Sequence, residues 1–360
     1  MSEGQLAKWL DGLAALGGLV SAAEAAVADL ERGVLFRHAA GYRVGGERLE
    51  PGAGARFDAA SLTKPWMATL ALALDQEGSL PLATPIGGLT PRVAPALAGC
   101  TLEDLLRHRT GLPAWTPLAL RLGRRLRERE ALRDFLAGCA GAPGFETAAA
   151  EPGYSDLGYI LWGLLAEQCT GRSLAALLDR EVCAPLGLAP LGTLAAEPPQ
   201  AVECRLDNGR EVELAAGQGL RLARQRSFLR GQPQDGNARA LGFLSGHAGL
   251  FLTADELLAL GREWLAPGRL LSRGSVARAL ADGGPWALGW ARASGEGSSG
   301  PELAATGSAF GHAGFTGGSL WIDPAAQRIY LLLAHRLASA IDLNPVRREF
   351  HRLAIEAFPA

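Results

Sequence analysis

Lysine is almost missing from this chain of 360 residues. Lys8 and Lys64 are its only lysines, so arginine supplies nearly all of the 35 Lys and Arg side chains. Arginine stays protonated in proteins, whereas a lysine amine loses its proton when burial or a nearby cation lowers its pKa. Only two positions in the chain can therefore offer an amine as a proton acceptor.

Metal and disulfide patterns are also missing. The five cysteines contain no Cys-x-x-Cys pair and are odd in number, which favours buried, reduced thiols over a disulfide framework. There is no His-Glu-x-x-His motif and no Cys/His cluster, and these are the common signatures of metal sites. No Gly-x-Ser-x-Gly motif is present, which excludes the α/β-hydrolase type of serine esterase. We expect no metal and no cofactor.

No apolar run is long and uncharged enough to cross a membrane. The first 16 residues carry Glu3 and Asp11 and lack a continuous apolar core, so we do not expect a signal peptide. The net charge is −2 without a basic block, which argues against nucleic acid as a partner. Arg121–Arg133 is rich in arginine, but its interleaved Leu and Glu predict a solvated helix face. These absences favour a cytoplasmic protein.

One of the two lysines occupies a position that matters chemically. Lys64 follows Ser61 by three residues, and on a helix this spacing places both side chains on one face. A serine hydroxyl is a weak nucleophile until a neighbouring base takes its proton. Pro65 disfavours helical geometry at Lys64 and is tolerated only if the helix begins near Ser61. We therefore expect Ser61 at a helix N-terminus, where negative charge is favoured.

Hydrophobic periodicity and turn residues predict the other elements. They are an N-terminal amphipathic helix (Met1–Leu16), two hairpin strands (Gly18–Leu30 and Gly33–Tyr42), the Ser61 helix (Asp58–Gly78), a short helix from Thr101 to His108, helices over Arg121–Gly187, a capped helix (Thr253–Trp264), a Gly/Ser loop (Ser294–Ser308), two antiparallel strands (Phe315–Ile322 and Arg328–Ala334) and a closing helix (Pro345–Phe358). We expect one domain over residues 1–360. Residues 1–75 and 240–360 would form an α/β part with both chain ends in one sheet, about 76–190 a helical lobe, and 192–237, which has no clear period, an insertion.

Two further motifs could converge on Ser61 and Lys64. Tyr154-Ser155-Asp156 lies on a loop that Pro152-Gly153 opens, and Gly311-His312-Ala313-Gly314 enters a predicted strand. Taken alone, Tyr154 can equally be a packing tyrosine and Asp156 a helix N-cap. His247-Ala248-Gly249 repeats the His-Ala-Gly string. We favour His312 because a strand pattern and a terminal helix follow it, and we expect His247 to be structural or to shape the far wall of the site.

In this order and at these separations, the motifs resemble those of the penicillin-recognising serine hydrolases: class C β-lactamases, D-alanyl-D-alanine carboxypeptidases and esterases of the same fold. Their pattern is Ser-x-x-Lys, then Tyr-x-Asn or Tyr-Ser-x, then Lys/His-x-Gly. Flanking phrases extend the resemblance over nearly the whole chain, at Leu105–Pro113, Pro152–Gly163, Gly246–Leu252 and His312–Pro324. The resemblance implies an α/β (α+β) fold of the β-lactamase/transpeptidase type, with an antiparallel sheet flanked by helices and a mostly helical lobe.

The resemblance also implies roles. Ser61 would attack a carbonyl and form an acyl-enzyme, while Lys64 and Tyr154 would share proton transfer. The backbone N–H groups of Ser61 and Phe315 would form the oxyanion hole, and Gly314 would let the strand edge approach the substrate. Which of Lys64 and Tyr154 is the general base stays open.

Two positions depart from the β-lactamase pattern. Asp156, which would hold Lys64, stands where class C enzymes usually have asparagine, and a carboxylate there favours the ammonium form of Lys64. His312, which would help to place the substrate, replaces a lysine, and a neutral imidazole holds a substrate carboxylate less firmly. We therefore expect hydrolysis of small carboxylic esters or related acyl compounds. The alternatives are a β-lactamase or D-alanyl-D-alanine carboxypeptidase, and a covalent β-lactam binder that does not turn over.

Overall fold

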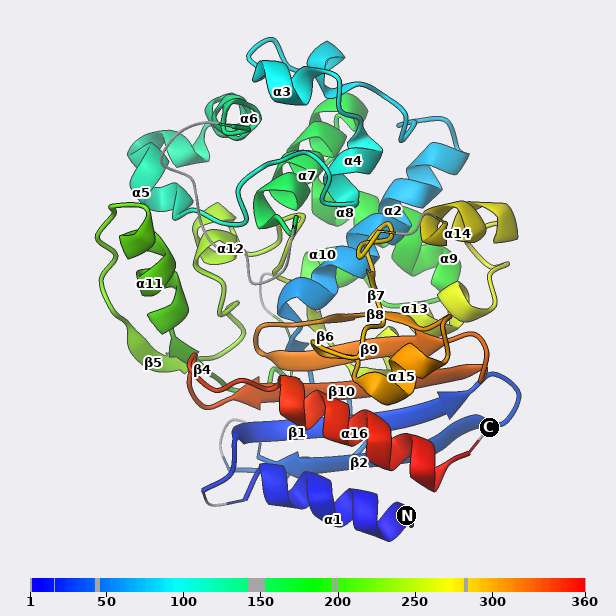
Figure 1. Ribbon diagram of the computed structural model, residues 1–360. Helices are drawn as coiled ribbons and strands as arrows, with labels where there is room; N and C mark the ends of the chain where they lie inside the picture. Colours follow the sequence, from blue (N-terminus) through cyan, green and yellow to red (C-terminus); the bar gives the residue numbers. More distant parts are fainter. Residues whose placement is uncertain are drawn as a thin grey trace.

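Strands from both ends of the chain form one six-stranded antiparallel sheet in the computed structural model (Figure 1). The order is β2 (Gly33–Gly41), β1 (Val20–Asp29), β10 (Arg328–Arg336), β9 (Gly317–Asp323), β8 (Phe310–Ala313) and β7 (Ala291–Arg292). The two ends of the chain are joined where β1 pairs with β10, from Val20–Arg336 to Asp29–Arg328. The expectation that both chain ends share one sheet is confirmed.

The structure describes residues 2–15, 17–42, 46–141, 153–195, 198, 200–281 and 284–359. Three parts of the sequence predictions lie outside these residues. They are Leu16, where the N-terminal helix was expected to end, Gly45, in the Gly/Pro-rich segment after the predicted hairpin, and Glu151-Pro152, at the start of the predicted Tyr154 loop. All five cysteines are described and unpaired. Three are buried as expected, but Cys100 is only half-buried and Cys169 is exposed. No described helix has the length and apolarity needed to cross a membrane.

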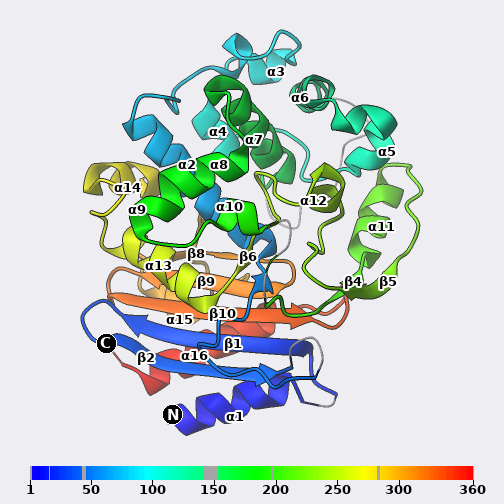
Figure 2. The same ribbon diagram turned by 180° about the vertical axis from the view of Figure 1, so that it is seen from behind.

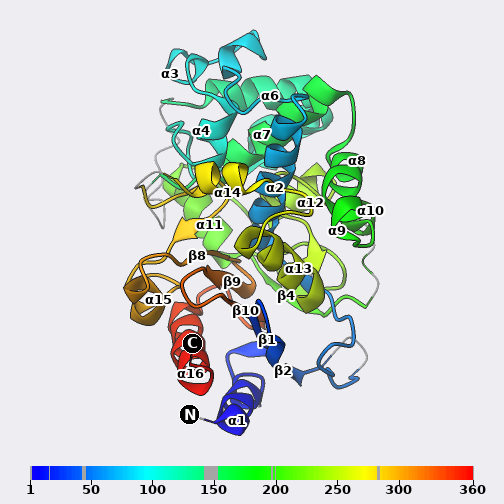
Figure 3. The ribbon, with the colours of Figure 1, turned by 90° about the vertical axis from the view of Figure 1, so that its right-hand side faces the viewer.

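Helices cover both faces of the sheet, which Figure 3 shows nearly edge-on. One face packs against α1 (Glu3–Leu13), α16 (Asn344–Ala357) and the short α15 (Pro301–Ala305). The Trp9 and Phe350 rings stack between α1 and α16, with centroids 6.4 Å apart. The other face packs against α13 (Ala254–Leu265), whose Thr253 cap agrees with the sequence prediction. The Gly/Ser loop expected at Ser294–Ser308 is wrong in part, because Pro301, well placed in a first helical turn, begins α15 there.

The helical lobe lies against this second face (Figure 2). Its helices are α2 (Thr63–Gln76), α3 (Pro95–Ala98), α4 (Leu102–Leu106), α5 (Leu118–Leu122), α6 (Arg129–Gly138), α7 (Asp156–Thr170), α8 (Leu174–Leu178), α9 (Ala184–Leu186) and α10 (Leu191–Leu194). In α2 every residue from Thr63 to Leu74 is buried, so the helix is enclosed on all sides. α14 (Arg273–Leu280), from the last third of the chain, also contacts the lobe, because Arg107 donates to the carbonyls of Arg278 and Ala281.

The segment predicted as an insertion contains regular structure. It holds a two-stranded sheet, β4 (Cys204–Asp207) with β5 (Arg226–Leu229), the helix α11 (Gly209–Gly217) and the start of α12 (Gly236–Leu241). These elements are too short to give the sequence a clear period. A second small sheet pairs β3 (Phe57–Asp58) with β6 (Phe251–Leu252). Its strand β3 comes shortly before Ser61 in the chain.

Candidate active site

Ser61 lies where the expected helix begins. A single 3₁₀ turn, Ala60–Leu62, leads directly into α2 at Thr63. Pro65 falls in the first turn of α2, where its missing N–H costs no helical hydrogen bond. The Ser61 Oγ is 2.9 Å from the Nζ of Lys64, as the three-residue spacing predicts.

The amine of Lys64 is completely buried among three oxygen acceptors. Its Nζ lies 2.7 Å from Asp156 Oδ1, 2.9 Å from Ser61 Oγ and 3.1 Å from the backbone carbonyl of His247. Burial lowers the pKa of Lys64, and the facing carboxylate of Asp156 opposes this shift without reversing it. Of the two opposing effects expected from the sequence, burial and a facing carboxylate, burial outweighs the carboxylate and favours the neutral amine.

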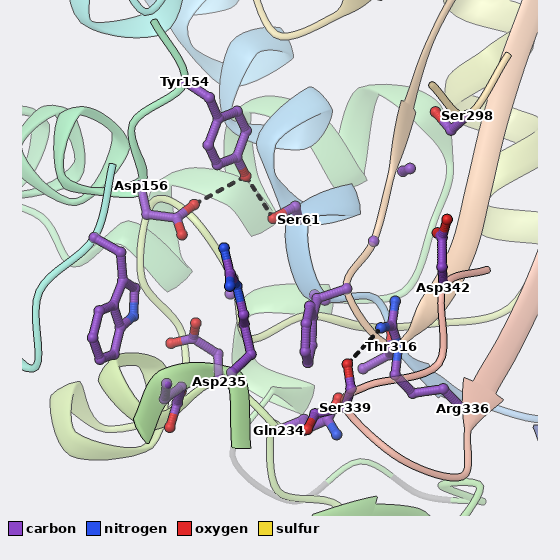
Figure 4. Close-up of a pocket in the computed structure, with 18 of the residues that line it drawn as sticks. Ser61, Tyr154, Asp156, Gln234, Asp235, Ser298, Thr316, Arg336, Ser339 and Asp342 are labelled. Carbon is purple, nitrogen blue, oxygen red and sulfur yellow. Dashed lines mark hydrogen bonds between the residues drawn. The ribbon is translucent and has the colours of Figure 1, made fainter. Parts of the chain in front are cut away.

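Tyr154 bridges the nucleophile and the carboxylate (Figure 4). Its hydroxyl is 2.8 Å from Ser61 Oγ and donates to Asp156 Oδ1 at 3.0 Å. Because the tyrosine proton points at Asp156, the phenol oxygen can accept from the Ser61 hydroxyl. The N-cap of α7 is Ser155, whose hydroxyl accepts from the Gly158 N–H. The alternative that Asp156 serves as an N-cap is therefore wrong, and its carboxylate is available to Lys64.

An imidazole that the sequence argument did not single out supports the Tyr154 ring. His108 is buried 4.7 Å from the Tyr154 ring centroid and 4.8 Å from that of Trp286. Its Nδ1 accepts the backbone N–H of Ser155 at 3.0 Å. Burial, with Lys64 and His312 nearby, holds the pKa of His108 well below its usual range. The neutral ring thus packs against the Tyr154 side chain and holds the backbone of its loop through the Ser155 N–H.

The backbone before Ser61 is held in an unusual conformation. Ala60 has a φ of 46°, a left-handed geometry that costs an alanine roughly 1 kcal/mol. The buried carboxylate of Asp58 accepts the Ala60 N–H at 3.0 Å, and the Asp58 carbonyl accepts from Thr316 Oγ1 at 2.7 Å. Burial raises the pKa of Asp58 to about 6. Asp58 therefore ties the Ser61 turn to the β8–β9 turn.

Gly314 makes this close approach possible. A Cβ at position 314 would lie 2.7 Å from the carbonyl oxygen of Ala59, well inside van der Waals contact. The following residue, Phe315, lies in the β8–β9 turn, since β9 begins at Gly317 and not at Phe315 as predicted. Within the described residues, the backbone N–H groups of Ser61 and Phe315 have no hydrogen-bond partner in the protein. Two free donors in this region meet one requirement of an oxyanion hole.

His312 presents an acceptor to the site. Its Nδ1 is 2.9 Å from the Ala313 carbonyl, and a carbonyl only accepts, so Nδ1 carries the proton. Burial, with Lys64 nearby, lowers the pKa of His312 to about 3, so the ring is neutral. Its Nε2 is buried without a partner among the described side chains and backbone. This bare Nε2 is complementary to a hydrogen-bond donor and not to a carboxylate.

These groups border one cavity of about 600 Å³ between the sheet and the lobe. Its lining includes every predicted site residue except the buried Lys64: Ser61, Tyr154, Asp156, His312, Gly314 and Phe315. Residues from the segment 192–237 also line it, among them Glu211 and Asp235. Figure 4 shows Asp235 facing the cavity from below Asp156. A volume of this size accommodates a small organic acyl compound.

Sequence reasoning missed three contributors: His108, Asp235 and the carbonyl of His247. Two of these contributors lie in sequence patterns that could have pointed to the site: His108 in the family-like segment Leu105–Pro113, and His247 in the repeated His-Ala-Gly string. Which oxygen of a turn faces a lysine is not visible in a sequence. His247 lies beside Lys64 and is not among the described residues that line the cavity, so of the two expected roles its position agrees with the structural one and not with the far wall.

A family model described as Beta-lactamase matches residues 13–351. The chain belongs to the beta-lactamase family. It is similar to the esterase EstB of Burkholderia gladioli, with 32% identity over 228 residues that cover 56% of this chain and 55% of the esterase. An N-acetylmuramyl-L-alanine amidase of Bacillus subtilis (strain 168) is 29% identical over 255 residues, covering 65% of this chain and 55% of the amidase. The chain thus matches little more than half the length of these relatives.

Solved structures agree with the family assignment. The structure described as "EstCE1, a hydrolase with promiscuous acyltransferase activity" superposes with a TM-score of 0.69 at 21% identity and covers 97% of this chain and 99% of that chain. Such a likeness concerns the fold. With the family match, it confirms the β-lactamase/transpeptidase-like architecture that the sequence motifs implied.

Gly314→Ala should lower kcat/KM for a neutral ester at least tenfold, because the added Cβ must push the β8–β9 turn away from Ala59. Gly318→Ala is the matched control in the same hairpin, since its Cβ would be closest to the flexible Leu62 side chain, at 3.0 Å, and would meet its other neighbours at ordinary van der Waals distances of 3.5 Å or more. Steady-state kinetics on both variants, with thermal unfolding to establish folding, tests this. Equal activity of the two variants would contradict it.

Proposed function

We propose that this protein is a serine hydrolase that cleaves small carboxylic esters or related acyl compounds through an acyl-Ser61 intermediate. The observation that carries the proposal is the contact of Ser61 Oγ with both Lys64 Nζ and the Tyr154 hydroxyl, at 2.9 and 2.8 Å, on the wall of the cavity. Membership of the beta-lactamase family and the similarity to an esterase support it. No cofactor enters the mechanism.

In this mechanism Ser61 attacks the substrate carbonyl while its proton passes to Lys64 directly or through the Tyr154 hydroxyl. The N–H groups of Ser61 and Phe315 stabilise the oxyanion. The leaving group takes the proton back, and water then attacks the acyl-enzyme with the same groups acting as base. Burial favours a neutral Lys64, so the amine is the stronger candidate for the base.

The neutral His312 favours uncharged substrates over β-lactams, whose carboxylate finds a lone pair and not a cation at this position. A β-lactamase or carboxypeptidase reaction is the second candidate, because the matching family model is described as Beta-lactamase and one similar protein of Escherichia coli (strain K12) is described as "Putative D-alanyl-D-alanine carboxypeptidase". A covalent β-lactam binder uses the same groups and differs only in deacylation. We propose a cytoplasmic location, which the five unpaired cysteine thiols support.

Ser61→Ala should abolish turnover of 4-nitrophenyl butyrate, and Lys64→Arg should lose activity nearly as completely while remaining folded, because arginine cannot take up the serine proton. Intact-protein mass after brief incubation with this ester, and separately with a fluorescent penicillin, gives the readout. A transient acyl adduct on wild type alone supports the esterase. A persistent penicilloyl adduct without ester turnover points to the binder, and an active Lys64→Arg enzyme excludes Lys64 as the base.

Asp156→Asn should move the acidic limb of the kcat/KM profile to lower pH. The base must be neutral to accept the Ser61 proton, so the rate falls as the pH drops through its pKa. Asp156 raises the pKa of Lys64 against the effect of burial, so removing this charge lowers that pKa. The same shift in a Tyr154→Phe background would assign the limb to Lys64. An unmoved limb would contradict the role of Asp156.

His312→Lys should raise the rate of acylation by benzylpenicillin relative to its methyl ester by roughly tenfold, since a charge-assisted hydrogen bond is worth about 1.5–3 kcal/mol. The methyl ester is the matched control because it lacks only the carboxylate charge. Stopped-flow acylation rates give the ratio. An unchanged ratio would show that His312 does not meet the substituent next to the scissile bond.

A further inference from the structure

A buried chain of hydrogen bonds runs behind Lys64 in the same part of the structure. The Ser245 hydroxyl is 2.6 Å from Nδ1 of His247, and Nε2 of His247 is 2.9 Å from Oδ1 of Asp235. The His247 side chain is 1% exposed, whereas Asp235 reaches the cavity wall. The mechanism above uses neither side chain.

One proton in this hydrogen-bond series has a defined position. Burial opposes ionisation of Asp235, but His247, the Ala238 N–H and Lys64 lower its pKa to about 2, so its carboxylate only accepts. Nε2 of His247 therefore donates to Asp235, while Nδ1 is hydrogen-bonded to the Ser245 hydroxyl. This is the order of a Ser-His-Asp triad. Ser245 is not a second nucleophile, because it is buried and is not among the described residues that line the cavity.

The Ser245–His247–Asp235 hydrogen-bond series is linked to the reacting groups through the backbone of His247. The His247 carbonyl accepts from Lys64 Nζ at 3.1 Å. Its turn is pressed against α7, since a Cβ at Gly246 would lie 1.9 Å from the Tyr159 carbonyl oxygen. With the turn held on one side by this contact and on the other by the imidazole, the direction of the carbonyl is set.

This direction matters when Lys64 is neutral. A neutral amine has two N–H groups and one lone pair, whereas Lys64 faces three oxygens. If the two N–H groups donate to Asp156 and to the His247 carbonyl, tetrahedral geometry directs the lone pair at the Ser61 hydroxyl. If the His247 carbonyl moves away, one N–H turns to Ser61 Oγ, and the lone pair no longer faces the proton that it must accept.

We propose that His247 and Asp235 are positioning residues that fix the His247 carbonyl and thereby aim the Lys64 lone pair at Ser61. The inference rests on the proposed hydrolase function and adds to it a specific requirement for proton transfer. Neither side chain contacts the reacting atoms. Their loss should therefore slow acylation and leave substrate binding nearly unchanged.

Two replacements of His247 separate positioning from packing. The amide nitrogen of glutamine can take the place of Nε2 and reach Asp235, whereas asparagine reaches only the Ser245 side. His247→Gln should stay within threefold of wild type in the burst rate with 4-nitrophenyl butyrate. His247→Asn should lose at least tenfold in that rate, with the Kd for the ester changed less than twofold. Thermal unfolding of both variants establishes that they are folded.

Asp235→Ser tests the same contact independently, from the side of the carboxylate. Its hydroxyl can still cap α12, as Asp235 does through the Ala238 N–H at 2.7 Å, but it is too short to reach His247. Asp235 also raises the pKa of Lys64 through its charge, so the rates are compared on the alkaline plateau of the pH profile, where Lys64 is neutral in every variant. There Asp235→Ser should lose as much acylation rate as His247→Asn, and the double variant should lose no more, because both break one contact. Equal rates of the Gln and Asn variants, or additive losses, would overturn the proposal. A wild-type protein without any Ser61-dependent burst would instead refute the hydrolase function.

Discussion

The structure depends on placing one amine in a fully buried position without leaving it unsatisfied. A buried charge is tolerated only when it is paired and hydrogen-bonded, and otherwise the group becomes neutral. Lys64 meets the two requirements only in part. Asp156 provides an opposite charge, while burial lowers the pKa of Lys64 and favours its neutral form. This neutral amine is the form that a general base requires. Three separate stretches of the chain meet around this amine, at Ser61, Asp156 and His247.

The sequence predicted the positions of these elements along the chain better than the contacts between them. The Ser61–Lys64 spacing, constrained by Pro65, located the start of a helix to within a residue or two. Apolar runs bounded by turns near both ends predicted strands that share a sheet. The fold class was implied by the resemblance of three motifs, in their order along the chain, to the penicillin-recognising serine hydrolases. The family match over residues 13–351 bears this out, while the roles of individual residues stay predictions.

What the sequence could not show falls into two kinds. Elements of four or five residues, such as β4, β5 and α15, carry no measurable period, so residues 192–237 and 294–308 were assigned too little structure. Contacts made by the backbone were invisible as well. The His247 carbonyl and the Asp58 carbonyl both act in the site through main-chain oxygens, which every residue type possesses. Desolvation of Lys64 likewise depends on neighbours distant in the chain.

The pairing of β1 with β10 sets an order of events for the folding chain. Arg328 donates to Asp29 across 299 positions, so the centre of the sheet closes only after almost the whole chain exists. At about 5–20 residues per second, the ribosome holds β1 and β2 without their partner for roughly 15–60 s. During that interval β1 presents an apolar strand edge, which is a template for aggregation. This topology leaves the N-terminal hairpin without its neighbouring strand until the residues of β10 have emerged.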